Sequence, residues 1–292
     1  MTKIEYKRKK NKKENIYGIL FILMPVIGFL LFTAISMGIS IFYSFTDFNP
    51  IRDEFKWIWF DNYVDLVTDE RFWSACLNTI IFLITIPVGM FIGLLLATYL
   101  KNLSKGSKII RLIYYLPAIS SAVAINIIWR YIFQMDYGLI NNILGTNIPW
   151  LGSSNPWLIK IAIIIKNIWS SIGGTMILYL AGLNAIPDSY YEAAKIDGAS
   201  PIKQFFTITV PLIKHTTFYL LITGIIGGLQ SYTDAQVFGQ GLEGARTIVF
   251  YIWHYGIDKS KYGLASAAST LLGIVIMIIT FIQFKKNKVV DI

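Results

Sequence analysis

Polar and aromatic side chains interrupt two long apolar runs of this 292-residue sequence, and hydrogen bonding to a solute is the chemistry that they offer. Amides and hydroxyls pair with a hydroxyl-rich solute, and aromatic rings pack against its C–H faces. Glycines within the same runs have no side chain and therefore leave space for the solute. We therefore expect a solute pathway suited to a carbohydrate at Asn167, Trp169, Ser170, Ser171, Gly174, Gly228, Gln230, Ser231 and Tyr232.

Two alternatives stay open for this set. Small residues also let helix backbones pack closely, which explains the serines and glycines without a solute. Asn167 can equally form a hydrogen bond between helices, and its neighbour Lys166 requires a polar cavity or an acidic partner at this depth. For Asp234 a structural pair or a role in an external gate is favoured over solute contact.

The sequence offers no catalytic or metal site. An enzyme within the membrane would need an acid, a base or a nucleophile clustered at membrane depth, and none cluster here. His215 and His254 are far apart and lack carboxylates at metal-binding spacing. A single cysteine, Cys76, excludes a disulfide framework. An ion channel is disfavoured because no filter-like repeat appears.

Composition makes lipid the expected solvent. Only 15% of the residues are charged and 55% are hydrophobic, whereas soluble domains carry about 25% charged residues. The net charge of +9 does not indicate nucleic acid, because the basic residues gather at the ends of apolar runs. Six runs are long enough to cross a bilayer as helices: about 16–46, 73–100, 109–133, 157–183, 206–238 and 262–284.

Lysine and arginine placement orients these six spans. Basic residues are dense in the tail 1–15, between the second and third spans, and in the tail 285–292, whereas the loop 134–156 has none. Positive loops stay in the cytoplasm. The chain is therefore expected to be a multi-pass protein of a bacterial-type cytoplasmic membrane with both termini cytoplasmic. The membrane domain would span 16–284, with a cytoplasmic loop at about 184–207.

That cytoplasmic loop has the pattern of two short helices. Ser189 and Glu192 have the spacing of a capping box, and Gly198 suits a left-handed helix end. Ser200 and Pro201 then indicate a second helix start. The loop is predicted to form two short helices at an angle, with a surface small enough to enter a groove of a soluble partner.

The same loop resembles the cytoplasmic EAA signature of binding-protein-dependent ABC importer permeases. The resemblance lies in Glu192-Ala193-Ala194, Gly198, Ile208 and Pro211, with Val210 in place of the usual leucine. Asp197-Gly198-Ala199 and Phe206 are similar to the sugar branch, which includes the maltose and glycerol-phosphate permeases. The likeness extends from about Ile16 to the C-terminus.

This resemblance implies an all-α, six-helix type I ABC importer permease with a coupling-helix loop, and a transport subunit instead of an enzyme. The expected partners are a second, homologous permease chain, two ATPase subunits and an extracytoplasmic solute-binding protein. ATP and Mg would bind the ATPase, since this chain lacks a Gly-x-x-x-x-Gly-Lys-Ser/Thr loop. The ATPase-coupling residues would be Glu192, Ala193, Ala194, Asp197, Gly198 and Ala199.

The cargo is the least determined part of this interpretation. In the maltose permease that the chain resembles, Asn167 matches an asparagine of the solute site, whereas most other positions differ, which argues against maltose itself. An amino acid, polyamine or oxyanion stays an alternative to a sugar. The outer loop Glu243-Gly244-Ala245-Arg246 is either a contact for the binding protein or a solvated turn.

Overall fold

The computed structural model describes residues 17–52, 55–103, 105–152 and 154–286. Within these ranges the secondary structure is helical, with one isolated antiparallel bridge between Thr46 and Trp57. The basic tail 1–15, the start of the first span at Ile16 and most of the tail 285–292 lie outside the described residues. The expected all-α fold is confirmed.

The chain divides into two compact units. The first comprises residues up to Leu66 together with Tyr255–Leu271. In it, the helix Tyr17–Tyr43, which includes η1 (Leu30–Ala34) and α2 (Ile35–Tyr43), meets the start of α15 (Tyr262–Lys286) through a 3.1 Å hydrogen bond between the Ser40 and Ser269 hydroxyls. Buried Asn62, in α3 (Asp61–Thr68), donates to the Ser44 and Thr46 carbonyls.

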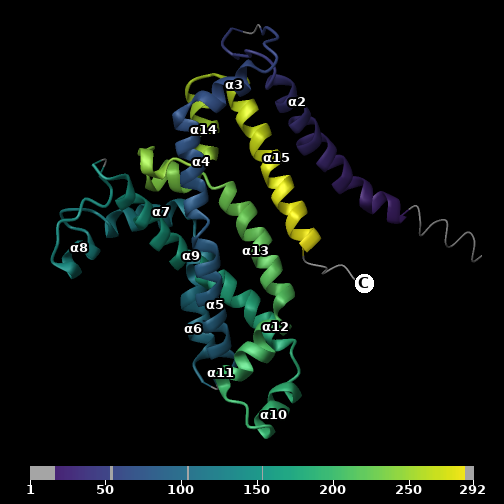
Figure 1. The fold of residues 1–292 in the computed structure, drawn as a ribbon, viewed down its shortest axis with the longest axis vertical. Helices are drawn as coiled ribbons and strands as arrows, with labels where there is room; N and C mark the ends of the chain where they lie inside the picture. Colours follow the sequence, from purple (N-terminus) through teal and green to yellow (C-terminus); the bar gives the residue numbers. More distant parts are fainter. Residues whose placement is uncertain (1–16, 53–54, 104, 153, 287–292) are drawn as a thin grey trace, which may run out of the picture. The chain divides into compact units, whose positions relative to one another are not determined.

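The second unit comprises Val67–His254 and the chain from Leu272 onward, and the helix α9 (Pro156–Asn184) lies at its centre. Along α9 lie α5 (Thr85–Lys101) and α6 (Ser107–Ile119) (Figure 1). A core of buried apolar residues joins α5 to α9, including Met90, Leu94, Ala97, Met176, Tyr179, Leu180 and Leu183. This unit carries both candidate sites.

Other elements of the second unit extend α9 and α5 at their two ends. At one end α4 (Glu70–Phe82) leads into α5, and α14 (Ile248–Trp253) packs against α4. At the other end, lowest in Figure 1, lies α10 (Ser189–Ile196). The remaining elements of this unit are α7 (Ala122–Ile132), α8 (Leu139–Leu144), α11 (Pro201–Gln204), η2 (Phe205–Thr209), α12 (Val210–Leu212), α13 (Lys214–Leu229), η3 (Asp234–Phe238) and η4 (Glu243–Ala245). The element η5 (His254–Asp258) belongs to the first unit from Tyr255 onward.

Four described helices are long and apolar enough to span a membrane, and six spans result if each bent helix pair counts as one. The third predicted span is one of those pairs: α6 and α7 meet at 101° just after Pro117. The fifth was predicted to run from 206 to 238. It begins at Pro201, bends by 65° at Ile213 and ends at Leu229.

Glycines decide how closely the helices of the second unit approach. On α5, Gly89 and Gly93 face the side chains of Ser171 and Thr175 on α9, and Thr175 donates to the Gly89 carbonyl at 3.3 Å. Gly173 lies against the backbone of Tyr114 on α6, with no room for a Cβ atom. Absent side chains therefore set the spacing of α5, α6 and α9, as the tight-packing alternative proposed.

We expect Gly173→Ala to destabilise the second unit by about 1–3 kcal/mol, because an added methyl group would overlap the α6 backbone. The measurement is the midpoint of heat-induced loss of monodispersity for the purified protein in detergent. The matched control is Gly174→Ala, one residue along the same helix, where a Cβ atom would meet nothing within 4 Å. Equal midpoints for the two variants would contradict the close approach of α6 and α9.

Candidate functional site

The segment with the EAA pattern folds as a helix, a turn and a second helix. Gly198 has φ +71°, and the amides of Asp197, Gly198 and Ala199 close the end of α10 on its last carbonyls. The Ser200 hydroxyl then accepts the Lys203 amide, and Pro201 occupies the first helical position. The predicted end of the first helix and start of the second are therefore confirmed.

Two local predictions for this segment are wrong. Ser189 is the first residue of α10 and not its cap, so the Ser189–Glu192 capping box does not form; Asp188 is the N-cap and makes no side-chain bond to the helix. Its carboxylate instead pairs with Lys101 of α5 at 3.3 Å. The second helix is not a short one, since α11, η2 and α12 continue without interruption from Pro201 to Leu212.

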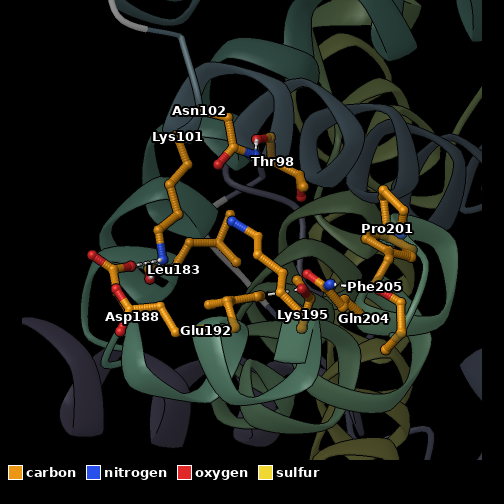
Figure 2. Close-up of a pocket in the computed structure, with 13 residues that line it drawn as sticks. Thr98, Lys101, Asn102, Leu183, Asp188, Glu192, Lys195, Pro201, Gln204 and Phe205 are labelled. Carbon is orange, nitrogen blue, oxygen red and sulfur yellow. Dashed lines mark hydrogen bonds and ion pairs between the residues drawn. The ribbon is translucent and has the colours of Figure 1, made fainter. Parts of the chain in front are cut away.

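A cleft of about 660 Å³ lies between α10, the ends of α5 and α9, and the start of α11. Polar side chains of α5, α10 and α11 reach into it, and α9 contributes Leu183 (Figure 2). Lys101 extends from α5 toward Asp188 and the Leu183 carbonyl (Figure 2), and the Gln204 amide donates to the Ala199 carbonyl at 2.8 Å. The cleft is therefore the inner face of the α10 segment.

The outer face of this segment is exposed and partly apolar. Glu192, Ala193, Asp197 and Gly198 are exposed, whereas Ala194 and Ala199 are half-buried. Ile196 is 86% exposed, Ile202 72% and Phe206 63%. Large apolar side chains that are this exposed at a helix turn carrying small residues make a surface suited to another protein. We call Glu192, Ile196, Gly198, Ile202 and Phe206 the coupling surface.

A second polar centre lies within the helices, where a buried ion pair joins α9 to η3. The Lys166 ammonium binds the Asp234 carboxylate. It also donates to the side-chain amide oxygen of Asn126, in α7, at 2.9 Å. The Asn167 amide donates to the other Asp234 oxygen at 2.8 Å. Lys166, Asp234 and Asn126 are all buried. The expected acidic partner of Lys166 is thus Asp234.

These contacts connect three elements that are distant in sequence. A buried ion pair is retained at low cost only when further hydrogen bonds satisfy both ions, and Asn126 and Asn167 supply these bonds. Arg130, one turn after Asn126, donates to the Phe238 carbonyl at the end of η3 at 2.5 Å. The network therefore fixes η3 against α7 and α9, and Asn167 forms the hydrogen bond between elements that was one of its two interpretations.

Other residues of the predicted pathway on α9 lie beside an aromatic pair. The Trp169 ring meets Trp129 of α7 edge to face at 5.4 Å, and Trp169 is 43% exposed. Ser170 Oγ, Trp129 Nε1 and Asn126 Nδ2 are among the buried polar atoms that have no hydrogen-bond partner within the described residues. Ser171 instead donates to the Ile168 carbonyl of its own helix, and Gly174 faces open space.

Sequence reasoning missed Asn126 and Trp129, which come from the third span. A polar amide within the apolar run 109–133 was the available signal for Asn126. Unpaired buried donors are costly unless something accepts from them. The hollow beside the tryptophan rings is lined by Ile125, Ile128, Trp129, Ile132 and Trp169, so it offers ring faces to a solute, whereas the unpaired donors are buried.

The pathway residues at the end of α13 and directly after it serve other contacts. Gly228 lies against the Leu83 side chain, and the Ser231 carbonyl accepts the Thr247 hydroxyl at 2.6 Å. Tyr232 bonds to Gln236 and its ring packs on Phe250 and Trp253. Gln230 is the exposed C-cap of α13. These contacts join α13 to α14 and do not bring this part of the set against Trp169.

The loop Glu243–Arg246 is not a solvated turn. Gly244 and Ala245 are buried, and Gly244 packs against Pro156 at the start of α9. Buried Asn78 of α4 donates to the Glu243 and Arg246 carbonyls at 2.8 and 3.0 Å. The loop is therefore a fixed element where α4 and α9 meet.

Comparison with known proteins gives one family and many relatives. Residues 89–286 match the family described as the binding-protein-dependent transport system inner membrane component. The chain is 35% identical to the probable ABC transporter permease protein YesP of Bacillus subtilis, over 96% of this chain and 93% of that protein. It is 34% identical to the lactose transport system permease protein LacF of Rhizobium radiobacter, over 76% of this chain and 78% of that protein.

Solved structures agree with the fold. The structure of a bacterial ABC transporter that imports the acidic polysaccharide alginate contains a chain that matches with a TM-score of 0.84 and 26% identity. The match covers 98% of this chain and 100% of that chain. The same kind of transporter in complex with its periplasmic protein, which holds an alginate pentasaccharide, matches with a TM-score of 0.83.

We expect Asp234→Asn to cost about 3–5 kcal/mol, because it removes one partner of a buried ion pair and leaves the Lys166 ammonium uncompensated. Heat-induced loss of monodispersity in detergent measures the effect. The double variant Lys166→Met with Asp234→Leu removes both charges and should recover a large part of the lost stability. A single variant as stable as the unaltered protein would show that the pair does not hold η3.

Proposed function

Because the chain belongs to the family of binding-protein-dependent transport system inner membrane components, we propose that it is the permease subunit of an ATP-driven importer for a carbohydrate. The coupling surface is the observation that carries this proposal. It projects exposed apolar and acidic side chains from a rigid helix turn, and this chain has no phosphate-binding loop of its own. An ATPase in a separate chain is the partner that such a surface would serve.

The proposed orientation places α10 in the cytoplasm. Lys101 ends α5 and lines the cleft with α10, and Lys105, Lys108 and Arg111 follow it before or at the start of α6. Lysine and arginine mark the cytoplasmic side of membrane proteins. Both termini are then cytoplasmic, and the loop Glu243–Arg246 faces the outside, where a solute-binding protein delivers the cargo.

In the proposed assembly this chain contacts lipid, a second homologous permease, two ATPase subunits, an extracytoplasmic binding protein and the solute. The residues proposed to meet the ATPase are Glu192, Ala193, Ala194, Asp197, Gly198 and Ala199. ATP binding would close the two ATPase subunits and move α10. The central helices would then alternate between inward-open and outward-open arrangements.

A carbohydrate is the cargo class that the aromatic rings on α7 and α9 favour. Trp169 and Trp129 offer ring faces and edges, whereas the unpaired polar atoms of Ser170 and Asn126 are buried. Relatives named for lactose and for multiple sugars support the same class. An anionic solute such as an oxyanion would need an available cation, and Lys166 already pairs with Asp234.

Purification of the tagged chain from its source membrane tests this function. We expect an ATPase and a second permease to co-purify, and the associated binding protein to retain a saccharide that mass spectrometry can identify. Isolation without any ATP-binding chain would overturn the importer proposal. A binding protein that retains an amino acid or a polyamine would leave the importer standing and overturn the cargo class.

We expect Gly198→Val to reduce the amount of ATPase retained on the tagged chain by roughly tenfold. A β-branched residue is strained at φ +71°, so the backbone of the turn would change its conformation. The measurement is the ratio of ATPase to permease after purification. Gly145→Val is the matched control, because Gly145 also has positive φ but ends α8, apart from α10 (Figure 1). Equal retention in both variants would remove the α10 turn from the docking site.

A further inference from the structure

Lys101, the last residue of α5, contacts three groups at the end of α9 and in the segment that follows it. Its ammonium donates to the Leu183 carbonyl at 3.1 Å and pairs with the Asp188 carboxylate at 3.3 Å. It also lies 4.6 Å from the centre of the Tyr191 ring. Figure 2 shows the side chain reaching down from α5 between Leu183 and Asp188, at the edge of the cleft. The three groups belong to the end of α9, the cap of α10 and α10 itself.

Helix electrostatics explain why a cation occupies this position. The last carbonyls of α5 and α9 lack partners within their helices and give each end a partial negative charge, which a lysine compensates. Asp188 stands at the start of α10, where the partial charge is positive. One ammonium therefore stabilises two helix ends and binds the acid that caps a third helix.

The contacts continue past α10 to the helix Pro201–Leu212. The Tyr191 hydroxyl, whose ring faces Lys101, is 3.1 Å from the Thr209 hydroxyl, and Thr209 is buried. The Gln204 amide ties the start of that helix to Ala199 at 2.8 Å. A continuous set of contacts therefore leads from α5 through Lys101 and Tyr191 to the helix that begins the fifth span.

We propose that Lys101 is a positioning residue for energy coupling, which makes the end of α5 and the α10 segment move as one body. This inference rests on the proposed importer function and goes beyond the EAA residues. Of those residues, Glu192 and Ala199 line the cleft while Ala193, Asp197 and Gly198 are exposed outside it, whereas Lys101 links α10 to the central helix pair. Displacement of α10 is thereby transmitted to α5 directly, in addition to the covalent path through α9.

The three contacts of Lys101 differ in weight. Asp188 has a side-chain exposure of 78%, so water and salt screen its pair with Lys101. The Lys101 side chain is 17% exposed, and its bond to the Leu183 carbonyl and its ring contact are better shielded. Lys101→Met should therefore have a larger effect than Asp188→Asn. Lys101→Arg keeps the charge, the donor and the stacking and should restore most of the contact.

Hydrogen exchange of the purified permease in nanodiscs tests the contact itself and needs no partner chain. We expect the amides of residues 184–199 to exchange about tenfold faster in Lys101→Met, since one charge-assisted hydrogen bond is lost. Lys101→Arg should exchange as the unaltered protein does. Lys108→Met is the matched control, because Lys108 is an exposed lysine on the neighbouring helix α6. Unchanged exchange in Lys101→Met, or no rescue by arginine, would overturn the proposal.

Hydrolysis of Mg-ATP by the complex with its companion chains, in proteoliposomes, tests the coupling role. We expect Lys101→Met to retain the ATPase fully and to lower ATP turnover about tenfold, with Lys101→Arg and Lys108→Met near the unaltered rate. A merely structural role would lower retention and turnover together, and that result would overturn the proposal. If even the unaltered chain retains no ATPase, the importer function fails, and the exchange experiment still judges the Lys101 contact.

Discussion

The close packing of α5 against α9 is the constraint on which the second unit depends. Gly89 and Gly93 allow the two backbones to approach until Thr175 of α9 bonds a carbonyl of α5. Because the helices run together to their ends, Lys101 reaches the carbonyl of Leu183. A wider spacing would remove that contact and open the cleft beneath it. Gly89 and Gly93, about two to three turns before Lys101 on α5, therefore set the geometry of the α10 segment.

The two polar centres of this unit have different physical characters. Lys166 and Asp234 are buried and fully bonded, so their attraction is little screened and fixes η3 in one position. Lys101 and Asp188 stand at the boundary with water, where each contact is weak and three together define the geometry. The first arrangement holds η3 within the helices, and the second joins the end of α5 to the α10 segment at the edge of the cleft.

Much of the fold was predictable, because apolar run length and glycine or proline placement act locally. The helix end at Gly198 and the start at Ser200-Pro201 followed from backbone preferences alone. The capping box at Ser189 failed because Asp188 took the cap position, and a lysine 87 residues earlier in the chain binds its carboxylate. Asn126 and Trp129 were missed for the same reason: only the packing of α7 on α9 places them beside Lys166 and Trp169. The bends at 101° and 65° also depend on neighbouring helices, since a proline marks where a break can occur and not its size.

The exposed side chains of Ile196, Ile202 and Phe206 have a consequence for the biosynthesis of the protein. In the proposed orientation Ile196 faces water until the ATPase covers it, whereas Ile202 and Phe206 lie at the start of the fifth span. A chain without its ATPase would then expose apolar surface to chaperones, proteases and other unassembled chains. Balanced synthesis of this subunit and of the ATPase would keep such surface covered, and proteases would recognise surplus copies by it.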